Sequence, residues 1–200
     1  MTKPIIRAGT VGEVRPESGD WVFVDLGFAK DGQKSCGFLE ANKDPNIYTF
    51  GGLVDRLKAL VVDGEVPLNL VLEAPLSVAF SSQGNPLGRL IEKHRDGRTR
   101  YWYVGLGCSV LTSATYLLRQ LTDSPRTRDI RLFEGFVSFK LGGQGSDHRA
   151  DVLALRQVVC NPSATNVFGP DQLASGADQL RSAFAVAGMD YGIPPVLLVG

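Results

Sequence analysis

The sequence predicts an α/β fold in which helices flank a mixed central sheet. Residues 21–26 and 34–39 form an expected antiparallel hairpin around Asp31-Gly32, since this dipeptide tolerates the positive φ of tight turns. Beyond residue 50, apolar strand-like runs alternate with amphipathic helical segments, which is typical of α/β folds with parallel later strands. The 200 residues show no internal repeat, so we expect one domain over 1–200.

The first half of the chain supplies most of the expected strands and the first helix. Residues 4–15 are mildly apolar and could form an extra strand or an ordered arm. A short third strand is expected near residues 47–50. Apolar residues at helical spacing then predict a helix over 53–61. The next strand covers 68–73, and Pro75 ends it because proline cannot continue a central ladder.

The second half begins with the longest expected loop. Residues 80–100 are polar and rich in glycine, serine and arginine, and long loops in compact domains are usually functional or disordered. The elements expected after it are a helix over 106–121, a strand over 129–134, a helix from Ser146 or Asp147 to about Cys160, a last helix over 170–188 and an extended segment over 193–199.

The composition describes a soluble protein without a strong electrostatic preference. Lysine plus arginine and aspartate plus glutamate both number 21, so any surface for nucleic acid must be a local patch. Cys36, Cys108 and Cys160 are odd in number and form no CxxC pair, which fits a reducing cytoplasm. No signal peptide and no run of roughly 18 apolar residues is present, so we expect no membrane contact. The sequence leaves a homodimer open.

Three strands end in an acidic residue. Asp25, Glu73 and Glu134 each follow an apolar run, and a glycine or proline comes within two residues. The C-terminal ends of parallel strands line the ligand crevice of an open α/β sheet. Carboxylates gathered there repel one another unless a cation neutralises them, and an all-oxygen site suits Mg²⁺ or Mn²⁺. The sequence therefore predicts a carboxylate metal site, although any one of these acids could instead support a turn.

The helix after the glycine-rich link supplies further acids. Asp147 and Asp151 are four residues apart and share one helical face, so either could reach the same metal site. Asp151 stands among apolar neighbours, which is unusual for an acid in an amphipathic helix. Asp147 has an equally good interpretation as the residue that caps the helix.

A basic and aromatic segment is the expected contact for nucleic acid. Cations neutralise phosphates, and aromatic faces stack on unpaired bases. The alternative is a solvated loop followed by an aromatic cluster in the core. The residues expected to bind are Arg89, Lys93, Arg95, Arg98, Arg100 and Trp102.

These motifs together resemble the ribonuclease H-like superfamily. Its members open with three antiparallel strands, and their acids lie on the first strand, on the fourth strand and on a late helix. The matching segments here are Val24-Asp25-Leu-Gly27, Leu72-Glu73-Ala-Pro75 and His148-Arg-Ala-Asp151, the last of which is similar to the late helix of Holliday-junction resolvases. The resemblance implies a three-layer fold.

A family of the same fold, classed as a domain of unknown function, is more similar still. The segments that carry this resemblance are Glu73-Ala-Pro-Leu76, Phe133-Glu134-Gly135 and the run from Asp190 to Val196 with its Ile-Pro-Pro motif. Glu134 lies outside the minimal acidic set of the superfamily.

The resemblance implies a nuclease that hydrolyses phosphodiester bonds of DNA or RNA. Two divalent cations, Mg²⁺ or Mn²⁺, would bind about 4 Å apart. Asp25 would bridge them, with Glu73 and Asp151 as partners and Asp147 as a further candidate ligand. Glu134 would act as an additional catalytic acid. His148 and Arg149 would contact nucleic acid, and His148 could also orient water.

Two other functions remain open from the sequence. One is a catalytically silent binding or scaffold protein that keeps this fold. The other is a nucleotide-dependent phosphotransferase of the actin and sugar-kinase kind, because such proteins also open with a strand that ends in Asp-x-Gly. The chain is short for the two domains of that class, and it contains no GxxxxGK[ST] phosphate loop.

Overall fold

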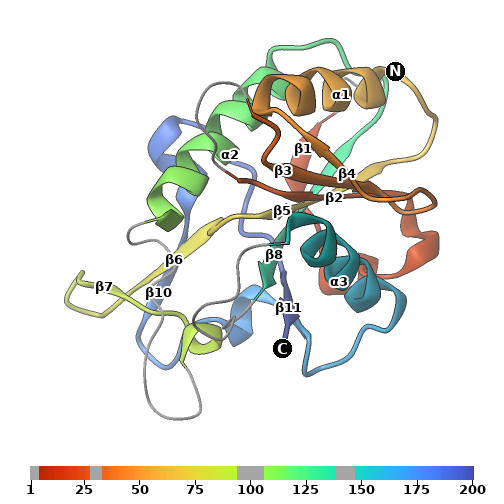
Figure 1. Cartoon of the computed structure of the whole chain (residues 1–200). Coiled ribbons are helices and arrows are strands. Elements are labelled where there is room, and N and C mark those ends of the chain that lie inside the picture. Colours follow the sequence, from red (N-terminus) through yellow and green to blue (C-terminus); the bar gives the residue numbers. More distant parts are fainter. Residues whose placement is uncertain (1–4, 28–32, 94–105, 138–146) are drawn as a thin grey trace.

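The computed structural model of the chain describes residues 5–27, 33–93, 106–137 and 147–200. A central sheet runs through the middle of the molecule (Figure 1). Its strands are β1 (Ile6–Ala8), β2 (Asp20–Asp25), β3 (Cys36–Glu40), β4 (Asn46–Tyr48), β5 (Leu68–Glu73), β8 (Ile130–Val137), β9 (Val167–Phe168) and β11 (Val196–Val199).

The sheet is mixed, as the sequence predicts. The strand order is β4-β3-β2-β5-β8-β11-β9, and β1 pairs with β8 beside this path. β4, β3 and β2 are antiparallel neighbours, whereas β2, β5, β8 and β11 are parallel. The strand expected near residues 47–50 is confirmed as β4. Of the two possibilities for residues 4–15, an extra strand or an ordered arm, the structure has a strand, β1.

Helices cover both faces of the sheet, which gives three layers (Figure 1). α1 (Phe50–Val62) and α2 (Leu106–Thr122) pack on one face, where Val22, Val24 and Leu72 lie in the same apolar cluster. α3 (His148–Cys160) packs on the other face against Trp21 and Phe23. Successive residues of a strand point to opposite faces and both faces are covered, so residues 21–24 of β2 are all apolar, and Asp25 follows them at its end. The predicted α/β fold class is confirmed.

One predicted helix is wrong. Instead of a helix over 170–188, the structure has a short 3₁₀ helix at Pro170–Gln172, the strand β10 (Gln179–Ser182) and a second 3₁₀ helix at Ala183–Ala187. Gly176 between them adopts a φ of +58°, which interrupts a right-handed helix. β10 gains its hydrogen bonds from β6 (Ser77–Phe80) instead, and β6 also pairs with β7 (Pro86–Leu87).

This small second sheet occupies part of the segment that was expected to be a loop. Within 80–93, the structure contains β7 and a 3₁₀ helix at Leu90–Glu92. The rest of the expected loop, residues 94–100, lies outside the described residues.

Two further observations concern the environment of the protein. None of the helices in the described ranges is long and apolar enough to cross a membrane. Cys36 is buried, whereas Cys108 and Cys160 are exposed, and all three are free thiols. Burial raises the pKa of the Cys36 thiol above its ordinary value, so this side chain stays protonated and packs as an apolar group.

Candidate metal site

Two of the predicted acids lie side by side at the ends of the central strands. Asp25 is the last residue of β2, Glu73 is the last residue of β5, and the two are paired in the parallel register. Paired residues of neighbouring strands point to the same face, which here is the face that α3 covers. Asp25 is only 5% exposed, and Glu73 is partly buried. Two carboxylates therefore share one end of the sheet.

The N-terminal turn of α3 brings two further groups to Asp25. His148 and Asp151 are three residues apart on one helical face, and Asp151 is 5% exposed. One nitrogen of His148 and one oxygen each of Asp25 and Asp151 lie within 4.8 Å of one another. His148 Nδ1 is 2.5 Å from Asp25 Oδ2. Asp25, His148 and Asp151, flanked by Glu73, are named the acidic cluster below.

Two glycines let α3 approach the sheet this closely. A Cβ atom on Gly37 would lie 2.4 Å from the carbonyl oxygen of His148. A Cβ atom on Gly27 would lie 2.7 Å from the His148 imidazole and 1.9 Å from the carbonyl oxygen of Ser35. Real Cβ atoms do not come so near, so any side chain at either position would push the start of α3 outward. Gly37 pairs with Asp25 across β2 and β3, and this places it directly beneath His148.

We expect Gly37→Ala to destabilise the protein by about 1–3 kcal/mol, the usual cost of overpacking a closely packed contact. The neighbouring atom is backbone and cannot rotate away. Urea unfolding followed by circular dichroism measures the change. Gly51→Ala is the matched control, because Gly51 lies in the first turn of α1 and no atom lies within 4 Å of the place that its Cβ would occupy, so alanine there is expected to be neutral or stabilising. Equal unfolding midpoints for the two variants would contradict the close docking of α3.

Asp147 caps α3 and is not a member of the acidic cluster. Its side chain accepts hydrogen bonds from the backbone N–H groups of Arg149, at 3.1 Å, and Ala150, at 3.4 Å. A carboxylate at this position satisfies free helix donors and interacts favourably with the positive end of the helix dipole. Of the two interpretations that the sequence left open for Asp147, the structure therefore supports the helix cap.

Glu134 faces away from the acidic cluster. In the register of β5 and β8, Glu73 pairs with Gly135, whereas Glu134 pairs with Leu72 on the opposite face of the sheet. A shift of one residue along a strand moves a side chain to the other face. Glu134 is fully buried there and accepts a hydrogen bond of 2.9 Å from the backbone N–H of Leu76. The expectation that Glu134 joins Asp25 and Glu73 is corrected.

Arg89 is the partner of Glu134 and is likewise fully buried. Its Nη1 donates to Glu134 at 2.8 Å and to Ser77 at 2.9 Å, and its Nε donates to Glu92 at 2.7 Å. Burial acts to lower the pKa of Arg89, but Glu134 and Glu92 outweigh it, so the pKa lies above its ordinary value. A side chain with no exposed surface cannot contact nucleic acid, so that prediction for Arg89 is wrong.

His148, which was also expected to bind nucleic acid, lies in the acidic cluster, and the remaining residues divide into two groups. Lys93 and Arg149 are exposed on the surface. Arg95, Arg98, Arg100 and Trp102 lie outside the described residues.

The acidic cluster has the chemistry of a divalent-cation site. Two carboxylates with 5% exposure lie within a few ångströms of each other, and a third is adjacent. Placing acidic side chains side by side in a buried position is costly unless positive charge balances them. Aspartate and glutamate oxygens with one imidazole nitrogen form a common donor set for divalent metals. The residues present therefore fit a metal ion. The sequence suggested Asp25, Glu73 and Asp151 as metal ligands, but it did not suggest His148.

Fold and site define the class of this protein as a three-layer α/β protein with a carboxylate–histidine cluster at the C-terminal ends of its parallel strands. Comparisons with family models, with curated proteins and with solved structures found no match.

Proposed function

We propose that this protein is a divalent-metal-dependent nuclease that hydrolyses phosphodiester bonds of DNA or RNA. The observation that carries the proposal is the convergence of Asp25, His148 and Asp151, beside Glu73, at the C-terminal ends of two parallel strands. Asp25 is more than 120 positions away from His148 and Asp151 in sequence, yet ligand atoms of the three residues lie within 4.8 Å of one another. Buried acids gathered in this way are costly for stability, which favours a functional reason for them.

The arrangement of elements supports a place for the protein in the ribonuclease H-like superfamily. β2, β3 and β4 form three antiparallel strands, and the parallel strands β5 and β8 follow with intervening helices. The acids lie on β2, the first strand of the antiparallel group, on β5, the fourth strand counted from β2, and on the late helix α3. This distribution is the one that the sequence resemblance implies.

In this proposal, Asp25, Glu73 and Asp151 supply oxygen ligands and His148 supplies a nitrogen. Bound divalent metal would neutralise phosphate charge and activate water for attack on phosphorus. A mixed oxygen and nitrogen donor set suits Mn²⁺ and other first-row metals better than Mg²⁺. Asp25 holds the His148 ring in place through their 2.5 Å contact. Arg149, the next residue of α3, is exposed and would contact a phosphate of the substrate.

Metal-dependent cleavage is the direct test. Purified protein would be incubated with Mn²⁺ or Mg²⁺ and with labelled single-stranded, double-stranded and branched DNA and RNA. Cleavage of any of these that EDTA stops, with greater rates in Mn²⁺, supports the proposal. A protein that binds Mn²⁺ and yet leaves every substrate intact would instead favour the silent binding protein.

Metal binding itself is expected to raise the melting temperature. A ligand that binds only the folded state stabilises it by about 2.7 kcal/mol at 100 times its Kd. For a chain of this length that corresponds to an increase of roughly 5–10 °C. Differential scanning fluorimetry with Mn²⁺, and with EDTA as the reversal control, measures it. The increase should be smaller with Mg²⁺ and absent in Asp151→Asn, whereas an equal increase in that variant would place the bound metal elsewhere.

A further inference from the structure

Neighbouring strands place two acids and two glycines in one row across the sheet beneath α3. In the strand register, this row consists of Gly37 on β3, Asp25 on β2, Glu73 on β5 and Gly135 on β8. Paired residues point to the same face of a sheet, so the two carboxylates stand between two positions that have no side chain. A helix can therefore come close to the sheet at both ends of the row, with the acids between these two points.

One side of α3 matches this row. His148, Asp151 and Leu155 follow one another at spacings of three and four residues, so they lie on the same side of the helix. The carbonyl oxygen of His148 would lie 2.4 Å from a Cβ atom on Gly37. At the other end of the row, a Cβ atom on Gly135 would lie 2.8 Å from Cδ1 and 3.0 Å from Cδ2 of the fully buried Leu155. Asp151 lies between these two contacts and belongs to the acidic cluster.

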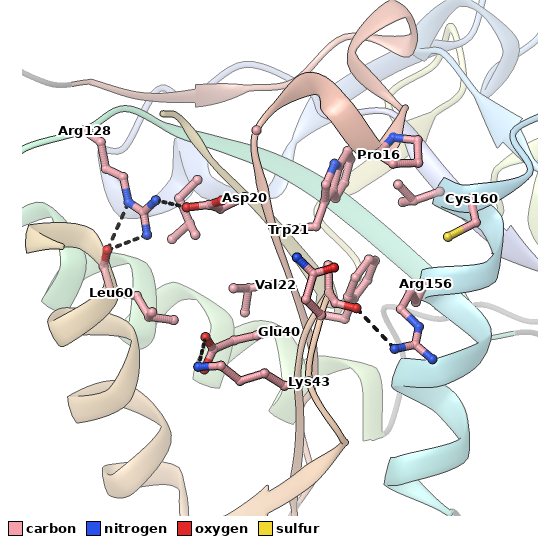
Figure 2. Close-up of a pocket in the computed structure, with 16 residues that line it drawn as sticks. Pro16, Asp20, Trp21, Val22, Glu40, Lys43, Leu60, Arg128, Arg156 and Cys160 are labelled. Atoms are coloured by element: carbon pink, nitrogen blue, oxygen red, sulfur yellow. Dashed lines mark hydrogen bonds and ion pairs between the residues drawn. The ribbon is translucent and has the colours of Figure 1, made fainter. Parts of the chain in front are cut away.

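The C-terminal half of α3 is held to the protein by other contacts. Arg156 donates a hydrogen bond of 3.2 Å to the carbonyl oxygen of Ala41, directly after β3, at the pocket shown in Figure 2. Val158 and Val159 are buried in the apolar cluster on this face of the sheet. A side chain added beneath His148 would therefore tilt the first turns of α3 away from the sheet instead of lifting the whole helix.

We propose that the height of α3 above this row, set by Gly37 and Gly135, selects the ion that the acidic cluster binds, in favour of Mn²⁺ and Mg²⁺ and against the larger Ca²⁺. The cluster takes its ligands from both layers, because Asp25 belongs to the sheet whereas His148 and Asp151 belong to the helix. The separation of the two layers thus limits the ligand distances. Gly37 and Gly135 act through these ligands as positioning residues.

The coordination of the ions explains the preference. Mg²⁺ binds oxygen at about 2.0–2.1 Å in near-ideal octahedral geometry, whereas Ca²⁺ takes about 6–8 oxygen ligands at about 2.3–2.6 Å in flexible geometry. Close docking of α3 favours short distances, and the nitrogen of His148 is a poor ligand for Ca²⁺. The inference rests on the proposed metal-dependent function, but only on its metal site and not on cleavage.

Titration calorimetry of metal-free protein with Mn²⁺ alone and with Ca²⁺ alone measures the two Kd values. Wild-type protein should bind Mn²⁺ more tightly. Gly37→Ala is expected to weaken Mn²⁺ binding by about 10- to 100-fold, the usual cost of disturbing groups that orient metal ligands. Ca²⁺ tolerates longer distances and irregular geometry, so its affinity should fall much less and the Kd values should converge. Gly135→Ala should act in the same direction but less strongly, because the end of the Leu155 side chain can partly move aside.

Two further variants separate helix height from lost stability. Leu155→Val, added to Gly135→Ala, removes the δ-carbons that the new Cβ would meet and should restore the wild-type ratio of Kd values. Val61→Ala changes a buried residue of α1 on the other face of the sheet, so it should lower the free energy of unfolding without changing this ratio.

The outcomes distinguish this inference from the proposed function. Wild-type ratios in folded Gly37→Ala and Gly135→Ala proteins, or an equally large change in Val61→Ala protein, would overturn the inference. Wild-type protein that binds neither ion would overturn the metal site and the inference together. Convergence of the Kd values in the two glycine variants, in a protein that cleaves no nucleic acid, would support the inference and contradict the nuclease.

Discussion

Asp25→Asn is expected to reduce metal-dependent cleavage by about 1,000-fold or more, because several kcal/mol of transition-state stabilisation depend on the metal and each 1.36 kcal/mol is worth a factor of ten. Asparagine has the shape of aspartate but lacks its charge, and Asp25 is the residue that contacts both the neighbouring strand and His148. The measurement is the single-turnover rate at saturating Mn²⁺ on the best substrate found.

Two control variants separate this effect from a general loss of structure. Asp20→Asn changes the other aspartate of β2, which is exposed and far from the acidic cluster, and Glu134→Gln changes the acid on the opposite face of the sheet. Folded samples of both should retain most of the cleavage rate. Without metal, Asp25→Asn should melt at or above the wild-type temperature, since it removes repulsion between buried carboxylates. Wild-type cleavage by Asp25→Asn protein would exclude the acidic cluster as the site.

Arg89→Met is expected to destabilise the protein by about 3–5 kcal/mol, the usual result of removing one partner of a buried ion pair. Arg89 is fully enclosed, and it holds Glu92 and Glu134 through three hydrogen bonds and ion pairs of 2.7–2.8 Å. Methionine fills a similar volume but leaves these two glutamates without the guanidinium. The free energy of unfolding from urea denaturation is the measured quantity.

An exposed pair provides the comparison for this second effect. Arg119 and Asp123 form an ion pair on α2 with side chains that are 59% exposed, so Arg119→Gln should cost no more than about 0.5 kcal/mol. Adding Glu92→Gln and Glu134→Gln to Arg89→Met should recover part of the lost stability, because no unbalanced charge then remains buried. A loss below 1 kcal/mol for Arg89→Met alone would contradict the structural role assigned to this group.

The order of strands and helices could be predicted because local signals agree with it. The helical spacing of apolar residues in 53–61 and the capping acid before α3 each act over a few residues. The predicted Asp31-Gly32 turn lies outside the described residues. Residues 170–188 lack such agreement, since Gly176 and the pairing of β10 with β6 outweigh a weak helical pattern. Long-range strand pairing of this kind leaves no mark in a short stretch of sequence.

The acids of the cluster could be predicted from the sequence, but the faces of the sheet on which acids lie could not. Asp25, Glu73 and Asp151 could be found because an acid at the end of an apolar strand, or inside an apolar helical face, is conspicuous. Glu134 satisfies the same rule, yet it faces the other way because the register places Gly135, not Glu134, beside Glu73. Arg89 looked like a surface residue among polar neighbours, and only tertiary structure shows that two glutamates enclose it. The sequence shows where an acid ends a strand, but the sheet face that the acid occupies relative to its neighbours depends on the register of the strands.

The contact between Asp25 and His148 also affects the stability of the docking of α3 on the sheet. It joins the second strand to the last helix across 123 residues of chain. An ion shared by the two elements would act as a removable cross-link that closes this long loop, and closing a long loop restricts the unfolded chain most. The apo protein would then open first where α3 leaves the sheet, and metal would set how often that opening occurs. Occupancy of the cluster would thereby couple the lifetime of the folded state to the supply of metal in the cell.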